Sequence, residues 1–236
     1  MSELPLRAPH AAFTSAPARP ALVTLVLALA TAAGGCGTSV MVRRPADPAI
    51  DQALTAMWSD EIRRVARDGD WILVRSYASV GDAIVVMTGG EALSHATMYD
   101  GQTGTVIEAI TPAVREIALE ELVGRNHHVL IVRPPGDAAA QRAAVLRARS
   151  TLGTGFDLRG MFGVADRKDR FYCSELVYWA SDVAARDRRQ RFIITPASLV
   201  EHGEVVYWSG RRDDPQLQRV AAGWLAERAP ARVAGR

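Results

Sequence analysis

Apolar residues recur at helical spacing from Ala49 to Arg67, and Asp47-Pro48 stands before them as a helix start signal. Asp68-Gly69 interrupts the pattern. The sequence therefore predicts an amphipathic helix over 49–67. Its apolar positions are Ile50, Leu54, Met57, Trp58, Ile62 and Val65.

Short apolar runs rich in β-branched residues follow this helix, separated by turn residues. The first run is 71–74, and Gly81-Asp82 precedes the second. A short helical pattern, Leu119–Val123, lies between the last two runs. Beyond the first run, we predict buried strands over 83–87, 93–99, 105–110 and 129–132.

The second half of the chain returns to helical spacing. Asp137 caps an alanine-rich helix that runs to about Thr151, and the glycine-rich stretch 153–163 is irregular. Helices are predicted over 173–185, from Thr195-Pro196 onward and over 215–227, with a last strand over 205–208. Four or five short strands in one block flanked by helices favour an α+β domain.

The first 36 residues have the layout of a secretory signal. Arg7 and Arg19 precede an apolar run over 21–33, and small residues then lead to Cys36. The run is shorter than the roughly 20 residues that a membrane-spanning helix needs. The segment resembles a bacterial lipoprotein signal, although Ala33 stands where such signals usually have Leu.

This resemblance implies that Cys36 is lipidated and that the chain is anchored in the cell envelope, on the periplasmic side of a bacterial membrane. A plain signal peptide and an uncleaved anchor are the alternatives. We expect a lipoprotein signal over 1–35, a tether over 36–48, a catalytic domain over 49–210 and a C-terminal helix with a frayed tail over 211–236.

Composition narrows the classes of function. The formal net charge is +2, and the chain lacks the basic stripe with interleaved aromatics that a nucleic-acid-binding protein needs. The sequence has two cysteines. If Cys36 carries lipid, Cys173 has no partner for an intrachain disulfide, and a lone thiol in an oxidising compartment is either buried and inert or used in chemistry.

Four features follow one another along the chain: Gly81-Asp82, Ser94-His95, Glu108 and Cys173. They lie in segments that resemble the permuted NlpC/P60 (papain-like) hydrolases, and within these the YiiX-like permuted amidases. The resemblance spans residues 70 to about 205, with His95 ahead of Cys173 as permutation implies. The segments are GDAIVV, LSHATMYDG, VIEAI, VREIALEEL, VRPP and FYCSELVYWA.

The resemblance implies a permuted papain-like fold, an antiparallel sheet or partial barrel packed against helices. It assigns Cys173 as nucleophile, His95 as base and Glu108 as the residue that orients the base. Chemistry supports the same set, because a thiol attacks as thiolate and a helix N-terminus stabilises that charge. Glu108 lies 13 residues past His95, so adjacent antiparallel strands would place both on one face.

For other residues near these motifs, the sequence supports less specific roles. We expect the Cys173 backbone N–H to hold the oxyanion, with Tyr172 and Ser174 as candidates for oxyanion or substrate contact. Relatives often carry Gly-x-Tyr-Asp upstream of the cysteine, whereas this chain has Phe156 at the tyrosine position. We expect Asp82 to stabilise a turn or to cap a secondary-structure element.

No cofactor and no metal site is predicted. His127-His128 are consecutive residues of a predicted strand, so their side chains should point to opposite faces and not share an ion. The sequence contains no C-x-x-C or H-E-x-x-H pattern.

The leading hypothesis is a cell-envelope cysteine hydrolase that cleaves an amide or ester through an acyl-thioenzyme. The resemblance implies peptide, aminoacyl or acyl-conjugate substrates. An acyltransferase of the retinol-acyltransferase-like type would use the same thiol, and a surface-tethered binding module without catalysis is the third alternative.

Overall fold

A computed structural model describes residues 38–90, 92–163, 169–183 and 193–228, all within one compact unit, Cys36–Arg236. The predicted signal over 1–35 and Cys36 lie outside the described residues. Among the helices of the described part, none combines the length and apolar character required to cross a membrane.

Eight strands of the described residues form one sheet in the order β7-β6-β4-β3-β2-β1-β5-β8. Neighbouring strands are antiparallel except β6 and β7, which are parallel. The strands are β1 (Trp71–Ser76), β2 (His95–Asp100), β3 (Thr105–Ile110), β4 (Ala113–Ala118), β5 (Asn126–Arg133), β6 (Gly155–Phe156), β7 (Arg170–Phe171) and β8 (Glu204–Trp208).

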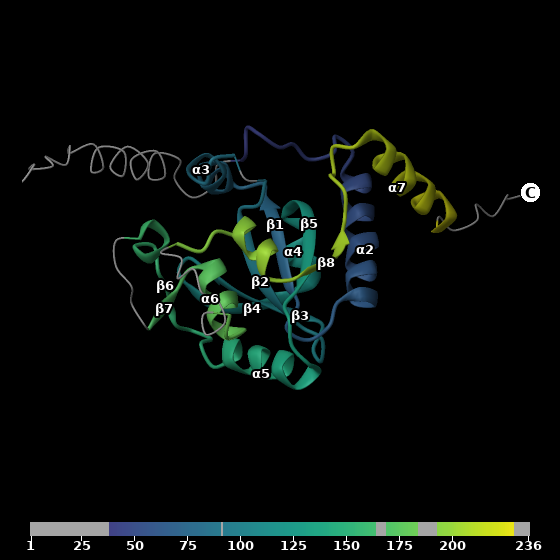
Figure 1. Cartoon of the computed structure of the whole chain (residues 1–236). Helices are drawn as coiled ribbons and strands as arrows, with labels where there is room; N and C mark the ends of the chain where they lie inside the picture. The colour runs from purple at the N-terminus through teal and green to yellow at the C-terminus, as the bar shows by residue number, and fades with distance from the viewer. Residues whose placement is uncertain (1–37, 91, 164–168, 184–192, 229–236) are drawn as a thin grey trace, which may run out of the picture. The chain divides into compact units, whose positions relative to one another are not determined.

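Helices cover both faces of this sheet (Figure 1). Alternating residues of β1 face two separate cores, as the two-residue period of a strand requires. Trp71 and Leu73 belong to the core of α5 and α6, whereas Ile72 and Val74 belong to the core of α2, α4 and α7. The helices are α2 (Pro48–Val65), α3 (Ser79–Met87), α4 (Leu119–Gly124), α5 (Ala138–Arg149), α6 (Cys173–Ala180) and α7 (Pro215–Arg228), with 3₁₀ turns over Gly160–Phe162 and Ala197–His202.

This architecture confirms the α+β fold class, with a largely antiparallel sheet packed against helices. The capping signals acted as expected: Asp47 accepts a hydrogen bond from the Ala49 N–H, and Asp137 accepts one from the Ala140 N–H. Helix α6 begins at Cys173 as predicted but ends at Ala180, not at 185. Asp182 has a φ of 55°, in the left-handed region, which ends the helical path.

The predicted strand over 83–87 is wrong, because these residues form the second half of helix α3. Both edges of β1 are already occupied, by β2 on one side and β5 on the other, so the sheet has no position for a strand that directly follows β1. Residues 83–87 therefore make their backbone hydrogen bonds within helix α3. Strands β4, β6 and β7 were not predicted.

The segment predicted as a tether is bound to the domain from its third residue. Thr38 pairs with Ala78, the residue before α3. The Ser39 hydroxyl donates to the Asp82 carboxylate at 2.6 Å, and the Val40 N–H donates to the same group at 2.8 Å. Residues 38–40 are thus held against the start of α3, while the wider domain boundaries stay predictions.

Candidate active site

His95 and Glu108 lie side by side on neighbouring strands. Strands β2 and β3 pair with Met98 opposite Ile107, and continuing this register by one residue puts Glu108 opposite Thr97. Glu108 therefore lies two residues from the level of His95, on the same face. The His95 Nε2 and a Glu108 carboxylate oxygen are 2.7 Å apart.

Cys173 is the first residue of α6, so its thiol lies beside the first N–H groups of a helix. The thiol lies close enough to the His95 side chain and to the backbone N–H of Ala96 for both to lower its pKa. Because His95 Nε2 is bonded to Glu108, the ring nitrogen available to the thiol is Nδ1. The structure thus brings the three predicted residues into one chain of contacts, Cys173 to His95 to Glu108.

These contacts favour a charged pair. Burial opposes ionisation of Cys173, but the hydrogen bond and positive charge of His95 outweigh it and lower the thiol's pKa. Burial also disfavours a charged imidazole, yet Cys173 and Glu108 raise the pKa of His95 to about 9. The lowered pKa of Cys173 and the raised pKa of His95 both favour a thiolate facing an imidazolium over the neutral pair.

Two arginines that the sequence reasoning missed bind Glu108, whose side chain is fully buried. Arg115 Nε donates to one carboxylate oxygen at 2.9 Å, and Arg125 donates to the oxygen that also contacts His95. Against the cost of burial, His95 and Arg125 lower the pKa of Glu108 to about 2. The sequence feature that could have identified Arg115 is the pairing register of β3 with β4, since Arg115 is directly opposite Glu108 in this hairpin.

We expect Arg125→Met to lower kcat about tenfold with little change in KM, because a charge-assisted hydrogen bond contributes about 1.5–3 kcal/mol and Arg125 positions the oxygen that holds His95. Loss of this cation should also raise the pKa of His95 and move the alkaline limb of the pH profile upward.

The matched control is Arg115→Met, which removes a half-exposed side chain from the other Glu108 oxygen and should cost less. Steady-state kinetics across pH measure both variants. Equal losses, or an unchanged alkaline limb in Arg125→Met, would contradict the positioning role. Arg125→Lys should restore part of the activity.

Tyr172 and Ser174, the two candidates for oxyanion or substrate contact, both bond to the backbone of Ile194. The Tyr172 hydroxyl accepts from the Ile194 N–H at 3.0 Å, and the Ser174 hydroxyl donates to the Ile194 carbonyl at 2.7 Å. Both side chains are buried. These bonds attach the start of α6 to residue 194, and the predicted role in catalysis stays a prediction.

The Gly81-Asp82 pair has a structural role in the described contacts. Asp82 accepts an ion-paired hydrogen bond from the buried Arg75, in addition to its bonds from Ser39 and Val40. A Cβ at Gly81 would lie 2.6 Å from an Arg75 guanidinium nitrogen and 3.1 Å from the Ser94 hydroxyl. Glycine is therefore required for the close approach of this ion pair to the residue before His95.

The argument that His127 and His128 point to opposite faces is wrong. Their Nδ1 atoms are 3.0 Å apart, because the pairing of β5 with β1 shifts register at this point. His128 Nε2 contacts the Ala92 carbonyl, and His127 Nε2 lies 3.0 Å from an Asp213 oxygen. Within the described residues, no three His, Cys, Asp or Glu side chains group as metal ligands would.

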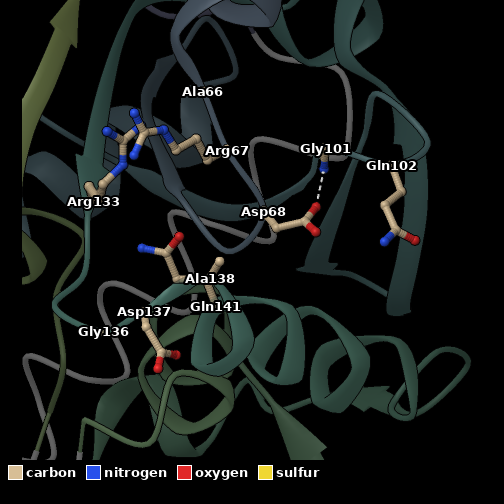
Figure 2. Close-up of a pocket in the computed structure, with 10 residues that line it drawn as sticks. All are labelled: Ala66, Arg67, Asp68, Gly101, Gln102, Arg133, Gly136, Asp137, Ala138 and Gln141. Carbon is tan, nitrogen blue, oxygen red and sulfur yellow. Dashed lines mark hydrogen bonds between the residues drawn. The ribbon is translucent and has the colours of Figure 1, made fainter.

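Figure 2 shows the residues that line a cavity of about 570 Å³. Gly101 and Gln102 of this lining come directly after β2, so the cavity lies at the end of that strand opposite His95. Its lining includes Arg67, Asp68 and Gly101, and the Gly101 N–H donates to Asp68 at 2.7 Å. At a rise of about 3.3 Å per residue, the length of β2 separates the two places by about 16 Å. This cavity is therefore distinct from the site of Cys173, His95 and Glu108.

A cysteine at a helix start, a histidine and a glutamate on adjacent antiparallel strands define a papain-like thiol enzyme, here with the histidine ahead of the cysteine in the chain. The model of the family described as "Permuted papain-like amidase enzyme, YaeF/YiiX, C92 family" matches residues 65–208, more than half of the chain. The chain belongs to this family of cysteine amidases, and the predicted resemblance is confirmed.

Among solved structures, the chain is similar to one titled "Crystal structure of metalloprotein yiiX from Escherichia coli O157:H7, DUF1105". The two share 22% sequence identity with a TM-score of 0.43, and the match covers 64% of this chain and 93% of that one. No curated protein matches the chain significantly.

Proposed function

We propose that this protein is a cell-envelope cysteine amidase in which Cys173, His95 and Glu108 act as nucleophile, base and orienting residue. The observation that carries the proposal is that the Cys173 thiol lies at the start of α6 within electrostatic reach of His95, whose side chain contacts the buried Glu108 at 2.7 Å. Family membership supplies the reaction class, hydrolysis by a papain-like enzyme.

The reaction follows from the ionised pair. The Cys173 thiolate attacks the substrate carbonyl carbon, and the developing oxyanion is stabilised by N–H groups of the first turn of α6, that of Cys173 among them. The His95 imidazolium then protonates the leaving amine, which leaves an acyl-thioester on Cys173. Neutral His95 then removes a proton from a water molecule as the water oxygen attacks the thioester carbon. The carboxylic acid product leaves, and Cys173 departs as a thiolate beside the His95 imidazolium, which restores the starting pair.

Location and substrate complete the proposal. The arrangement of Arg7, Arg19, the apolar run 21–33 and Cys36 supports export and a lipid anchor on Cys36, on the periplasmic side of a bacterial membrane. Peptide, aminoacyl and acyl-conjugate amides fit a thiol that forms an acyl-enzyme.

Alkylation by iodoacetamide tests the activated thiolate. Because the pKa of the Cys173 thiol is lowered, its labelling should be faster than that of a free thiol at about pH 6, where free thiols are almost fully protonated. The pKa of His95 is raised to about 9, so the ion pair persists below that pH and is lost above it. Hydrolysis should therefore decline as the pH rises through about 9.

His95→Gln is the control, since it keeps a polar side chain at this position and removes the cation. Labelling of Cys173 in that variant should shift to higher pH. If Cys173 in the unaltered protein labels no faster than a free thiol from about pH 5 to about pH 9, the proposed ion pair is absent.

A further inference from the structure

Helix α3 exposes apolar side chains to solvent and turns its one charged side chain inward, which is the opposite of an ordinary surface helix. Its sequence from Ser79 to Met87 contains one charged residue, Asp82. That carboxylate faces inward to the buried Arg75, and only Gly81 and Asp82 of this helix are buried. A surface helix normally turns its apolar side toward the core and its charges toward water.

Three apolar side chains of α3 are exposed. At about 3.6 residues per turn, Val80, Ile84 and Met87 share the side opposite Asp82, whereas Val86 lies on the flank, one turn after Asp82. Val80 is 53% exposed, Val86 65% and Met87 39%. None of the α3 side chains belongs to, or packs against, either hydrophobic core.

The segment that enters the domain also exposes apolar side chains. Val40 is 85% exposed and Met41 51% exposed, and the Val40 backbone is bonded to Asp82 on the inner side of α3. We call Val40, Met41, Val80, Val86 and Met87 the α3 surface. In Figure 1, α3 lies away from the helices of both cores and beside this incoming segment.

We propose that the α3 surface docks onto a lipid bilayer. The point of chain entry favours lipid over a protein partner: Thr38 pairs with Ala78 directly before α3, only a few residues after Cys36 and the apolar run 21–33. Arg43 is exposed three residues after Val40, where a cation attracts anionic headgroups. Exposed apolar side chains next to the proposed point of membrane attachment are typical of interfacial helices.

Docking here would set the orientation of the catalytic domain. The inner side of α3 approaches Ser94, the residue before His95, as the short distance from Gly81 to the Ser94 hydroxyl shows. The bilayer would therefore lie next to the start of β2. The proposal rests on the envelope location proposed above, and the experiment separates the two.

The test uses the full chain reconstituted in vesicles of phosphatidylethanolamine and phosphatidylglycerol. An environment-sensitive fluorescent amino acid replaces Val86 in one protein and Leu146 of α5, 53% exposed, in the control. Brominated acyl chains quench fluorophores that enter the bilayer. We expect a blue shift and strong quenching at position 86, neither at position 146, and the same result as position 86 when the reporter replaces Val80.

Flotation of the vesicles reports membrane attachment separately. Protein that floats while position 86 is quenched no more than position 146 retains the anchor and overturns docking. Protein that does not float overturns both the envelope location and docking. A blue shift at position 86 without quenching by brominated lipid shows that protein covers the α3 surface, and this also overturns the proposal.

Discussion

Replacing Cys173 by alanine is expected to abolish hydrolysis, with a loss of at least about 10⁴-fold in kcat, as for the nucleophile of other acyl-transfer triads. Cys173→Ser should be nearly as impaired, because the site stabilises a thiolate and a serine hydroxyl is far less acidic. Hydrolysis of 4-nitrophenyl acetate and of N-acyl amides measures the loss. Intact-mass spectrometry should show an acyl adduct on the unaltered protein and none on Cys173→Ala.

Ser174→Ala is the matched control, since it alters the next side chain along the same helix turn. Its hydroxyl bonds to the Ile194 carbonyl, so we expect a modest fall in thermal stability and less than about a tenfold fall in kcat. A larger fall in kcat with unchanged stability would indicate that Ser174 contacts the oxyanion. Substantial activity in Cys173→Ala would refute the assignment of the nucleophile.

Glu108→Gln should lower kcat by about 10³- to 10⁴-fold, because an amide neither supports the imidazolium nor fixes its tautomer. The variant nearly preserves the shape of a buried side chain that bonds His95 and two arginines. Removing the anion also lowers the pKa of His95, so the alkaline limb should move below its position near pH 9. Kinetics as a function of pH measure both effects.

The same substitution should change stability as a function of pH. The folded pKa of Glu108 is lowered to about 2, so its ionised form contributes stability above the unfolded value near 4.5 that is lost as the pH falls toward 2. Melting curves should lose part of this acid dependence in Glu108→Gln. Glu116→Gln, which alters a carboxylate of β4 that bonds Thr105 and Arg149, should leave kcat near normal. Activity of Glu108→Gln within tenfold of normal would contradict the orienting role.

Much of the site could be predicted from local sequence. Cys173 follows an extended Tyr172 and begins an apolar helical pattern, so its place at the start of α6 was evident. The spacing of His95 and Glu108 suited two short antiparallel strands, and the 2.7 Å contact agrees with that expectation. The short connection from β2 to β3 leaves few ways to pair the strands, which is why spacing was enough.

The residues around Glu108 could not be predicted in the same way. Arg115 depends on a register that is set by the packing of β4, a strand that was not predicted. Arg125 reaches Glu108 from the end of α4, through a contact that no sequence spacing specifies. The His127-His128 error has a similar origin, since one register shift in β5 changed which way the side chains point.

Helix α3 shows most clearly the difference between what the local sequence favours and what the folded chain adopts. Its β-branched residues favour a strand locally, and the sequence alone supported that prediction. Hydrophobic periodicity and capping residues specified most helices and the α+β class, because these depend on short-range backbone preferences. The occupied edges of β1, the ion pair of Arg75 with Asp82 and the arginines on Glu108 arose only in the folded chain, because each joins segments whose approach depends on the packing of the whole sheet.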